Sequence, residues 1–167
     1  MVRLNLEGTW LMTHAVATKA MIPQEGGKVV SVTLSPHHGL PGMAHSSAAR
    51  AAVENLMRVL SIEVALQYSP HGAASGHFDT EALEKYPGSV RESLAPSVPL
   101  GRLGRVEEQA WLVAYLASPA GDYFSGTTLT LDGARDNWVG PWPPPAMADP
   151  GGPPAAEARR TEPAPPQ

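Results

Sequence analysis

The sequence predicts an α/β protein in which helices alternate with the strands of a parallel sheet. Apolar residues recur at helical spacing in three long segments, and short runs rich in β-branched residues stand between them. This alternation is typical of parallel sheets that are covered by helices. With 167 residues and 43% hydrophobic content, the chain is long enough for one domain with a modest core.

The first predicted helix covers residues 7–21, where Leu11 and Val16 belong to an apolar face, and it ends at Pro23. The next segment, "KVVSVTL" at residues 28–34, is a short β-branched run of the kind found in buried parallel strands.

A second amphipathic helix is predicted over residues 47–66, because Val53 and Leu60 lie on one apolar face. The segment "RVEEQAWLVAYLAS" at 105–118 predicts a third helix, with two glutamates suited to the positive end of its dipole. Residues 126–133, "GTTLTLDG", predict a closing strand bounded by glycine and aspartate.

The composition changes near residue 139, so the sequence predicts a folded domain over 1–139 and a tail over 140–167. Ten of the eighteen prolines lie in residues 141–167. Such a segment cannot bury enough apolar surface to offset its ordering entropy, and we expect it to be disordered.

Composition also excludes several classes of function. The net charge of −4 and the scattered twelve Lys and Arg provide no basic surface for nucleic acid. No apolar run approaches the roughly 20 residues of a membrane span, and the N-terminus lacks the pattern of a signal peptide. We therefore expect a soluble cytoplasmic protein. The absence of cysteine excludes disulfides and thiol catalysis.

Four segments, in this order, resemble the second half of a short-chain dehydrogenase/reductase. They are "LNLEGT", "KVVSVTLS", "HSSAARAAV" and "PLGRLGRVEEQAWLVAYLASPAGDYFSGTTLTLDG". The resemblance implies the C-terminal half of a Rossmann-like, doubly wound sheet. It also implies hydride transfer between NADP or NAD, with NADPH favoured, and a carbonyl or an activated double bond.

In this family a tyrosine donates a proton, a lysine four residues later lowers its pKa and holds the ribose, a serine orients the substrate and an asparagine supports a water relay. By resemblance, Asn5 takes the place of the asparagine and Thr33 that of the serine, with Ser35 as an alternative. Ser46 stands at the tyrosine position and Arg50 at the lysine position. A guanidinium keeps the charge but not the geometry of an ammonium.

The serine at the tyrosine position resembles the enoyl-CoA and dienoyl-CoA reductase branch, and above all the peroxisomal trans-2-enoyl-CoA reductases. The resemblance therefore implies reduction of an enoyl-CoA-like double bond and a role in fatty acid metabolism. Reduction of a double bond conjugated to a thioester is helped by donors that hold the thioester oxygen. Thr33, Ser35 and Ser46 are the candidates for that role.

Gly76 and Thr80 match the glycine and threonine of the family's PGxxxT loop, which contacts the cofactor, with Ser75 in place of proline. The strand that precedes this loop in the family is not visible in residues 64–76. A local frameshift in the gene is one hypothesis for this loss.

No GxGxxG or TGxxxGxG pattern occurs in the chain. The resemblance then implies that the cofactor-binding first half of the domain is absent, and we expect the isolated chain to be inactive. Two alternatives stay open: a non-catalytic fragment or scaffold that associates with a full-length relative, and a carbonyl reductase or alcohol dehydrogenase.

Structural roles also compete with the catalytic ones. Asn5 and Ser46 are common helix caps, Thr33 is a common strand residue, and Arg50 is spaced to pair with Glu54. His37, His38 and His45 have no carboxylate at ligand spacing, so no metal site is predicted.

By resemblance, the helices at 7–21 and 47–66 form the surfaces of a homo-oligomer, and residues 81–103 form a lid over a small-molecule or acyl-CoA substrate.

Overall fold

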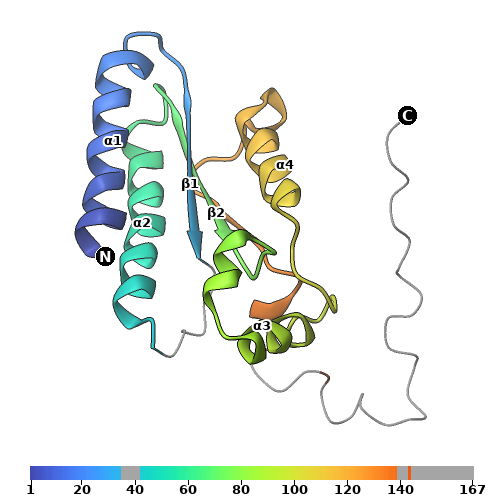
Figure 1. The fold of residues 1–167 in the computed structure, drawn as a ribbon. Helices are drawn as coiled ribbons and strands as arrows, with labels where there is room; N and C mark the ends of the chain where they lie inside the picture. Colours follow the sequence, from blue (N-terminus) through green and yellow to red (C-terminus); the bar gives the residue numbers. More distant parts are fainter. Residues whose placement is uncertain (35–41, 139–142, 144–167) are drawn as a thin grey trace.

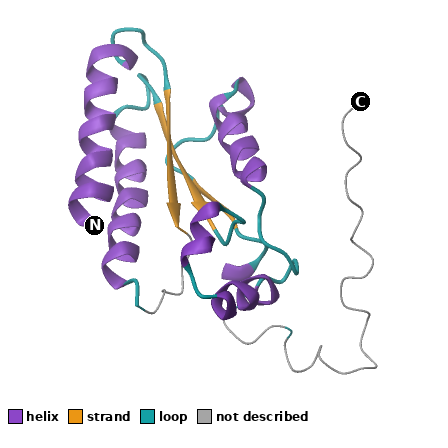
Figure 2. Ribbon diagram, viewed as in Figure 1, coloured by secondary structure: helices purple, strands orange, loops and turns teal. Residues whose placement is uncertain are grey.

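The computed structural model describes residues 1–34, 42–138 and 143. In this part of the chain, three parallel strands form one sheet in the order β1-β2-β3. Helices α1 and α2 lie together beside the sheet, and α4 lies on its other side (Figures 1 and 2). This is the Rossmann-like α/β fold that the sequence predicts. The tail predicted for 140–167 lies outside the described residues, apart from Pro143.

The first helical segment is longer than predicted and starts near the N-terminus. It consists of a π-helical turn at Arg3–Glu7, α1 at Gly8–Val16 and a second π-helical turn at Ala17–Met21. The chain then turns into the sheet at Gly27, whose φ of 155° disfavours other residues. A Cβ at this glycine would lie 2.6 Å from Cγ of Met21, so the position is closed to side chains.

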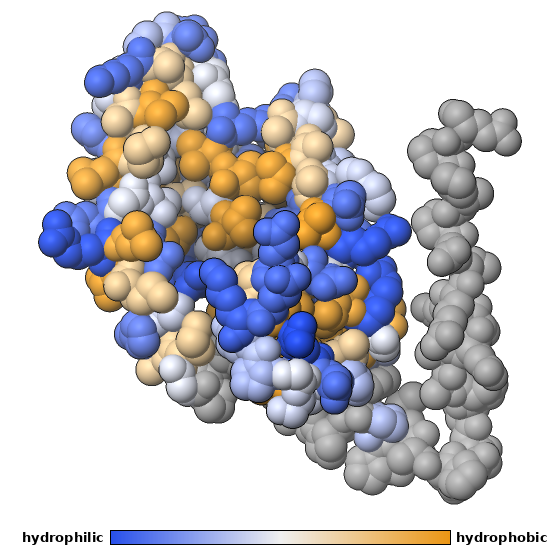
Figure 3. All heavy atoms as spheres, viewed as in Figure 1, coloured by the Kyte–Doolittle hydropathy of each residue, from blue (hydrophilic) through white to orange (hydrophobic). Residues whose placement is uncertain are grey.

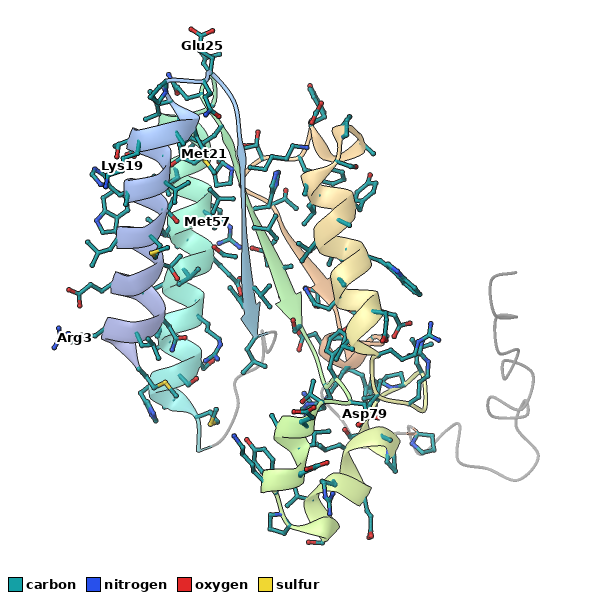
Figure 4. All side chains as sticks on the ribbon, turned by 45° about the horizontal axis from the view of Figure 1, so that its top comes forward. Arg3, Lys19, Met21, Glu25, Met57 and Asp79 are labelled. Atoms are coloured by element: carbon teal, nitrogen blue, oxygen red, sulfur yellow. The ribbon has the colours of Figure 1, made fainter. Side chains whose placement is uncertain are left out.

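Strand β1 spans Lys28–Leu34, as predicted. Helix α2 spans Ala44–Glu63, so it starts and ends three residues earlier than predicted. Its apolar side packs on the sheet through Met57, which has no exposed surface and accepts a hydrogen bond from Oγ of Ser31 at 3.4 Å (Figure 4).

Strand β2, at Ser69–Ser75, is the strand that the sequence analysis did not find. It occupies the centre of the sheet and pairs with β1 along its whole length and with β3 from Gly72 onward. Pairing on both sides overrides the weak strand propensity of "SPHGAAS". Pro70 is tolerated because its nitrogen faces β3 before that pairing begins. The expectation that no strand forms in residues 64–76 was therefore wrong.

Helix α4, at Val106–Ala117, and strand β3, at Thr128–Leu131, confirm the last two predicted elements. Side chains alternate along a strand, so Ser75 points to the face opposite that of Ser31. Ser75 donates a hydrogen bond to Gln109 of α4 at 2.9 Å. The two helical layers therefore cover opposite faces of the sheet.

The segment at residues 81–103 contains short helices at Glu81–Lys85, Gly88–Leu94 and Ala95–Ser97. They lie beyond the carboxyl ends of β1 and β2 (Figure 1). Two further 3₁₀ turns, Pro119–Gly121 and Arg135–Asn137, flank β3. No helix in the described residues has both the length and the apolar character needed to cross a bilayer.

Candidate active site

An open groove of about 480 Å³ runs between the first helical segment, β1 and α2. Three of the residues singled out from the sequence line it, each from a different element: Asn5, Thr33 and Arg50. Thr33 is the last but one residue of β1, so these side chains meet towards the carboxyl end of the strand. Ligands of parallel α/β sheets bind at that end.

Arg50 and Ser46 form a pair one turn apart on α2. Nη1 of Arg50 donates a hydrogen bond to Oγ of Ser46, and Ser46 is 0% exposed. The hydroxyl of Ser46 therefore holds the guanidinium and does not itself reach the groove. Arg50 is the one charged residue in the groove lining that the structure describes, and it makes this end of the groove attractive to anions and hydroxyl groups.

By resemblance, Thr33 is expected to orient the substrate, but in the structure its side chain contacts a residue of α2. Its hydroxyl donates a hydrogen bond to Oε1 of Glu54 on α2 at 3.0 Å, and Thr33 is 4% exposed. Among the described residues, no ion pair links Arg50 to Glu54, so that interpretation of their spacing was wrong. Glu54 is the residue of the site that sequence reasoning assigned to the wrong partner.

Asn5 lies inside the helical turn Arg3–Glu7 and does not act as its N-cap, which is Val2. Its Nδ2 donates a hydrogen bond to the carbonyl oxygen of Met1 at 3.2 Å, and its backbone carbonyl oxygen, which is not part of the side chain, accepts one from Oγ1 of Thr9 at 2.6 Å. The side chain is therefore held along the helix, on the side that faces the groove.

Gly76 and Thr80 follow the carboxyl end of β2 and do not line the groove. Gly76 packs against β3, where an added Cβ would lie 2.6 Å from Cα of Asp132. Thr80 precedes the short helix at Glu81–Lys85, and its carbonyl oxygen accepts a hydrogen bond from the amide of Leu83 at 2.9 Å. Ser35 lies outside the described residues.

Buried His71 and half-buried His77, near these strands, were not identified from the sequence as functional residues. Both ring nitrogens of His71 and Nε2 of His77 are buried without a hydrogen-bond partner in the described structure. Burial, and secondarily the charge of Lys28, lowers the pKa of His71. Burial, and secondarily the charge of Arg135, lowers the pKa of His77. Both rings are therefore kept neutral. In the sequence, each of these histidines is marked only by a neighbouring glycine, which does not indicate a buried ring.

No tyrosine belongs to the groove lining that the structure describes. Tyr68 precedes the amino end of β2, and Tyr115 lies on α4. Within the described ranges, no group of three or more His, Asp or Glu residues is placed to bind a metal; His37 and His38 lie outside these ranges.

Comparisons with known proteins identify the relatives of this chain. A family model described as "Enoyl-(Acyl carrier protein) reductase" matches residues 1–134. The chain is 31% identical over 134 residues to a 3-oxoacyl-[acyl-carrier-protein] reductase of Thermotoga maritima, and this match covers 79% of the chain and 54% of that protein. It is 32% identical over 148 residues to a probable 2,4-dienoyl-CoA reductase of Bacillus subtilis. This match covers 85% of the chain and 58% of that protein.

Solved structures give the same result. A gluconate 5-dehydrogenase from Burkholderia cenocepacia, crystallised with NADP and tartrate, matches with a TM-score of 0.76 and 30% identity, over 83% of this chain and 55% of that one. A second match, with a TM-score of 0.73, is described as a short-chain dehydrogenase/reductase family protein. The chain spans little more than half the length of these relatives, and it belongs to the short-chain dehydrogenase/reductase family.

Proposed function

We propose that the chain supplies the substrate side of an NADPH-dependent oxidoreductase that reduces an enoyl-CoA-like double bond. The observation that carries this proposal is the convergence of Asn5, Thr33 and Arg50, from three elements, on one groove towards the carboxyl end of β1. A relative in this family is described as a probable dienoyl-CoA reductase. A related structure contains NADP.

Each residue has a role that follows from its contacts. Arg50, held by Ser46, binds a ribose hydroxyl or a phosphate oxygen of the cofactor. Gly76 and Thr80, which follow β2 outside the groove lining, are by resemblance the further contacts of the cofactor. The bound nicotinamide supplies a hydride. Asn5, whose side chain is fixed by the carbonyl oxygen of Met1, orders water at the groove.

Thr33 and Ser35 are the proposed donors for the thioester oxygen of the substrate. Addition of hydride to the β-carbon of a conjugated thioester places negative charge on that oxygen, and hydrogen-bond donors stabilise it. In the structure the single proton of the Thr33 hydroxyl is donated to Glu54, so Thr33 donates to the thioester oxygen only after that proton turns from Oε1 of Glu54 to the substrate. Solvent then delivers the proton to the α-carbon, so the reaction needs no acidic side chain next to the thioester oxygen.

The lack of a tyrosine in the described groove lining favours a double bond over a carbonyl as the group reduced. A ketone becomes an alkoxide that must be protonated on oxygen, which requires a positioned acid. Relatives described as 3-oxoacyl-[acyl-carrier-protein] and acetoacetyl-CoA reductases make carbonyl reduction the competing activity.

The test joins the complete chain to the part of the Bacillus subtilis relative that this chain does not match, and follows the loss of NADPH or NADH absorbance. Addition of a trans-2-enoyl-CoA should oxidise NADPH faster than addition of a 3-oxoacyl-CoA. Faster oxidation with the 3-oxoacyl-CoA would make the chain a carbonyl reductase, and no oxidation with either would reject both activities.

A second candidate, a non-catalytic partner of a full-length relative, is favoured by the exposed apolar residues on the outer helices. Leu11 of α1 and Ile62 of α2 are exposed, as is Leu66 after α2. Sedimentation of the chain mixed with the Thermotoga maritima relative should then show a mixed complex. If the two proteins sediment separately at micromolar concentration, this candidate fails.

A further inference from the structure

The hydroxyl of Thr33 connects the groove to a carboxyl group that lies behind it. Thr33 belongs to the groove lining, and its Oγ1 donates a hydrogen bond to Oε1 of Glu54 at 3.0 Å. Glu54 lies on α2 and is half-buried, and it does not belong to the described lining. Glu54 therefore acts on a ligand in the groove through the hydroxyl of Thr33.

The direction of this hydrogen bond decides what Thr33 offers to a ligand. A hydroxyl has one proton and two lone pairs, whereas a carboxylate can only accept hydrogen bonds. With its proton on Glu54, Thr33 presents lone pairs to the groove. The oxygen of a thioester is also an acceptor, so the arrangement found in the structure does not match the substrate of the proposed function until a proton is added or turned.

The surroundings of the groove make an unpaired carboxylate costly. Apolar side chains from the first helical segment, β1 and α2 supply much of the lining, and they are Leu4, Met12, Val29, Val30, Val32 and Val53. Figure 3 shows apolar surface gathered between α1 and α4. If Thr33 simply turned its proton to a substrate, the carboxylate of Glu54 would lose its donor, and this loss costs more for a charged group than for a neutral one.

Among the described residues, no cation forms an ion pair with Glu54 that could replace the donor Thr33. Charged and titratable groups lie one turn away on α2 and on the elements packed against it, the helical turn Arg3–Glu7, β1 and β2. They are Arg50, Arg58, Arg3, Glu7, Lys28 and His71. Arg50, the cation of the groove lining, donates its hydrogen bond to Ser46 instead. Protonation is therefore the change that keeps Glu54 satisfied when Thr33 turns to a ligand.

We propose that Glu54 takes up a proton when the thioester substrate binds, and that the protonated carboxyl donates a hydrogen bond to Oγ1 of Thr33. Thr33 then donates its own proton to the thioester oxygen, and no carboxylate is left without a donor. The proton comes from solvent and returns to solvent when the product leaves, so no further reactant is consumed. Glu54 is a positioning residue in this account, which rests on the proposed function.

The test is titration calorimetry of a trans-2-enoyl-CoA into the complete chain joined to the unmatched part of the Bacillus subtilis relative. NADPH is left out, so that binding is not followed by reaction. Titrations in phosphate and in Tris, two buffers with different enthalpies of ionisation, give the number of protons taken up. We expect about one proton for each substrate bound, so the affinity should fall by about tenfold for each unit rise in pH between about 7 and 8.5.

Glu54→Gln isolates the role of the carboxyl group. The amide has nearly the same shape, and its NH₂ group donates to Thr33 without taking up a proton. This variant should bind the enoyl-CoA without proton uptake and with an affinity that does not change over the same pH range. Glu63→Gln is the matched control, because Glu63 is exposed on α2 and lies outside the groove lining, and it should take up a proton as the parent does.

Two variants of Thr33 separate this role from a purely structural contact. Thr33→Ser keeps the hydroxyl that links Glu54 to the substrate, so proton uptake should be retained. Thr33→Val removes that hydroxyl, and the substrate should bind without proton uptake. A contact that served stability alone would leave the proton count of all these variants the same.

Binding of the enoyl-CoA to the parent without proton uptake overturns the inference, because Thr33 then turns to the substrate at the expense of Glu54. Proton uptake that persists in Glu54→Gln overturns it as well, since another group then takes the proton. Both results leave the proposed function intact if NADPH is still oxidised. No binding of the enoyl-CoA at all would reject the proposed function, and the inference with it.

Discussion

Arg50 donates a hydrogen bond to the hydroxyl of Ser46, a residue with no exposed surface one turn earlier on α2. By resemblance, the pair occupies the two positions where the family carries tyrosine and lysine. In this chain the first position supports the second, because the buried hydroxyl holds the guanidinium at the groove. In the proposed function, Arg50 keeps a positive charge that binds the cofactor, whereas Ser46 does not replace the acidic phenol of a tyrosine.

Replacing Arg50 by methionine should therefore reduce NADPH affinity of the fused protein by about tenfold or more, since a charge-assisted contact contributes about 1.5–3 kcal/mol. The measurement is quenching of tryptophan fluorescence by NADPH. Arg58→Met is the matched control, because Arg58 is exposed on the same helix and does not line the groove. Equal affinity of the two variants would contradict the role of Arg50.

Thr33→Val should lower the free energy of unfolding by about 1 kcal/mol, because Oε1 of Glu54 loses its donor. It should also lower the rate of double-bond reduction. Thr33→Ser keeps the hydroxyl and should restore both quantities. If the valine variant reduces the enoyl-CoA as fast as the parent, Thr33 is a structural residue only.

Burial of His71 predicts that the protein loses stability in mild acid. The pKa of His71 is lowered in the folded state, so the unfolded chain binds the proton more tightly. Stability should therefore fall as the pH drops through about 6.5, the pKa of an unfolded histidine, and level off below the folded pKa.

Urea unfolding of the parent and of His71→Asn at several pH values measures this effect, and the variant should show a smaller loss of stability in that window. His45→Gln, at an exposed position, should behave as the parent. An unchanged slope in the His71 variant would assign the pH dependence to another group.

Glu108, at the start of α4, makes the stability depend on pH in a second and more acidic range. Hydrogen bonding from Arg102, with further contributions from Arg105, lowers its pKa to about 2. Its stabilising effect should be complete above about pH 4.5 and be lost as the pH falls through 2. At neutral pH, Glu108→Gln should cost about 0.5–1 kcal/mol of unfolding free energy, and Glu107→Gln, at an exposed position, should cost less. Thermal unfolding of both variants tests the difference.

Gly76→Ala should be strongly destabilising, because the new Cβ would lie 2.6 Å from Cα of Asp132, which is backbone. Such overpacking costs about 1–3 kcal/mol. Gly88→Ala is the control, since nothing lies within 4 Å of its Cβ and it stands at the start of α3. The control should unfold at the same or a slightly higher temperature. If both variants unfold at the same temperature, the ends of β2 and β3 can move apart to make room for the added Cβ of Gly76→Ala.

The elements with strong local patterns were predictable from the sequence. The β-branched run at 28–34 gave β1 with its observed bounds, and the helical spacing at 105–118 gave α4 to within one residue at each end. Strand β2 was missed because "SPHGAAS" has little strand propensity, and its conformation depends on two neighbours that lie far away in sequence.

In the candidate site, too, the local sequence predicts some features, whereas contacts between distant residues decide others. Asn5, Thr33 and Arg50 line one groove, and the order of motifs along the chain specifies which strand end and helix carry them. The partners of these residues were not predictable. Glu54 lies one turn from Arg50 in sequence yet bonds to Thr33, since helix packing on the sheet, and not helical spacing, decides which side chains meet.

The most direct test of the account is NADPH oxidation by the complete chain fused to the unmatched part of the Bacillus subtilis relative. With a trans-2-enoyl-CoA as substrate, the account predicts steady NADPH consumption that falls by about tenfold or more in the Arg50→Met variant and is unchanged in the Arg58→Met variant. A correctly folded fusion that binds NADPH but consumes none with the enoyl-CoA would contradict it.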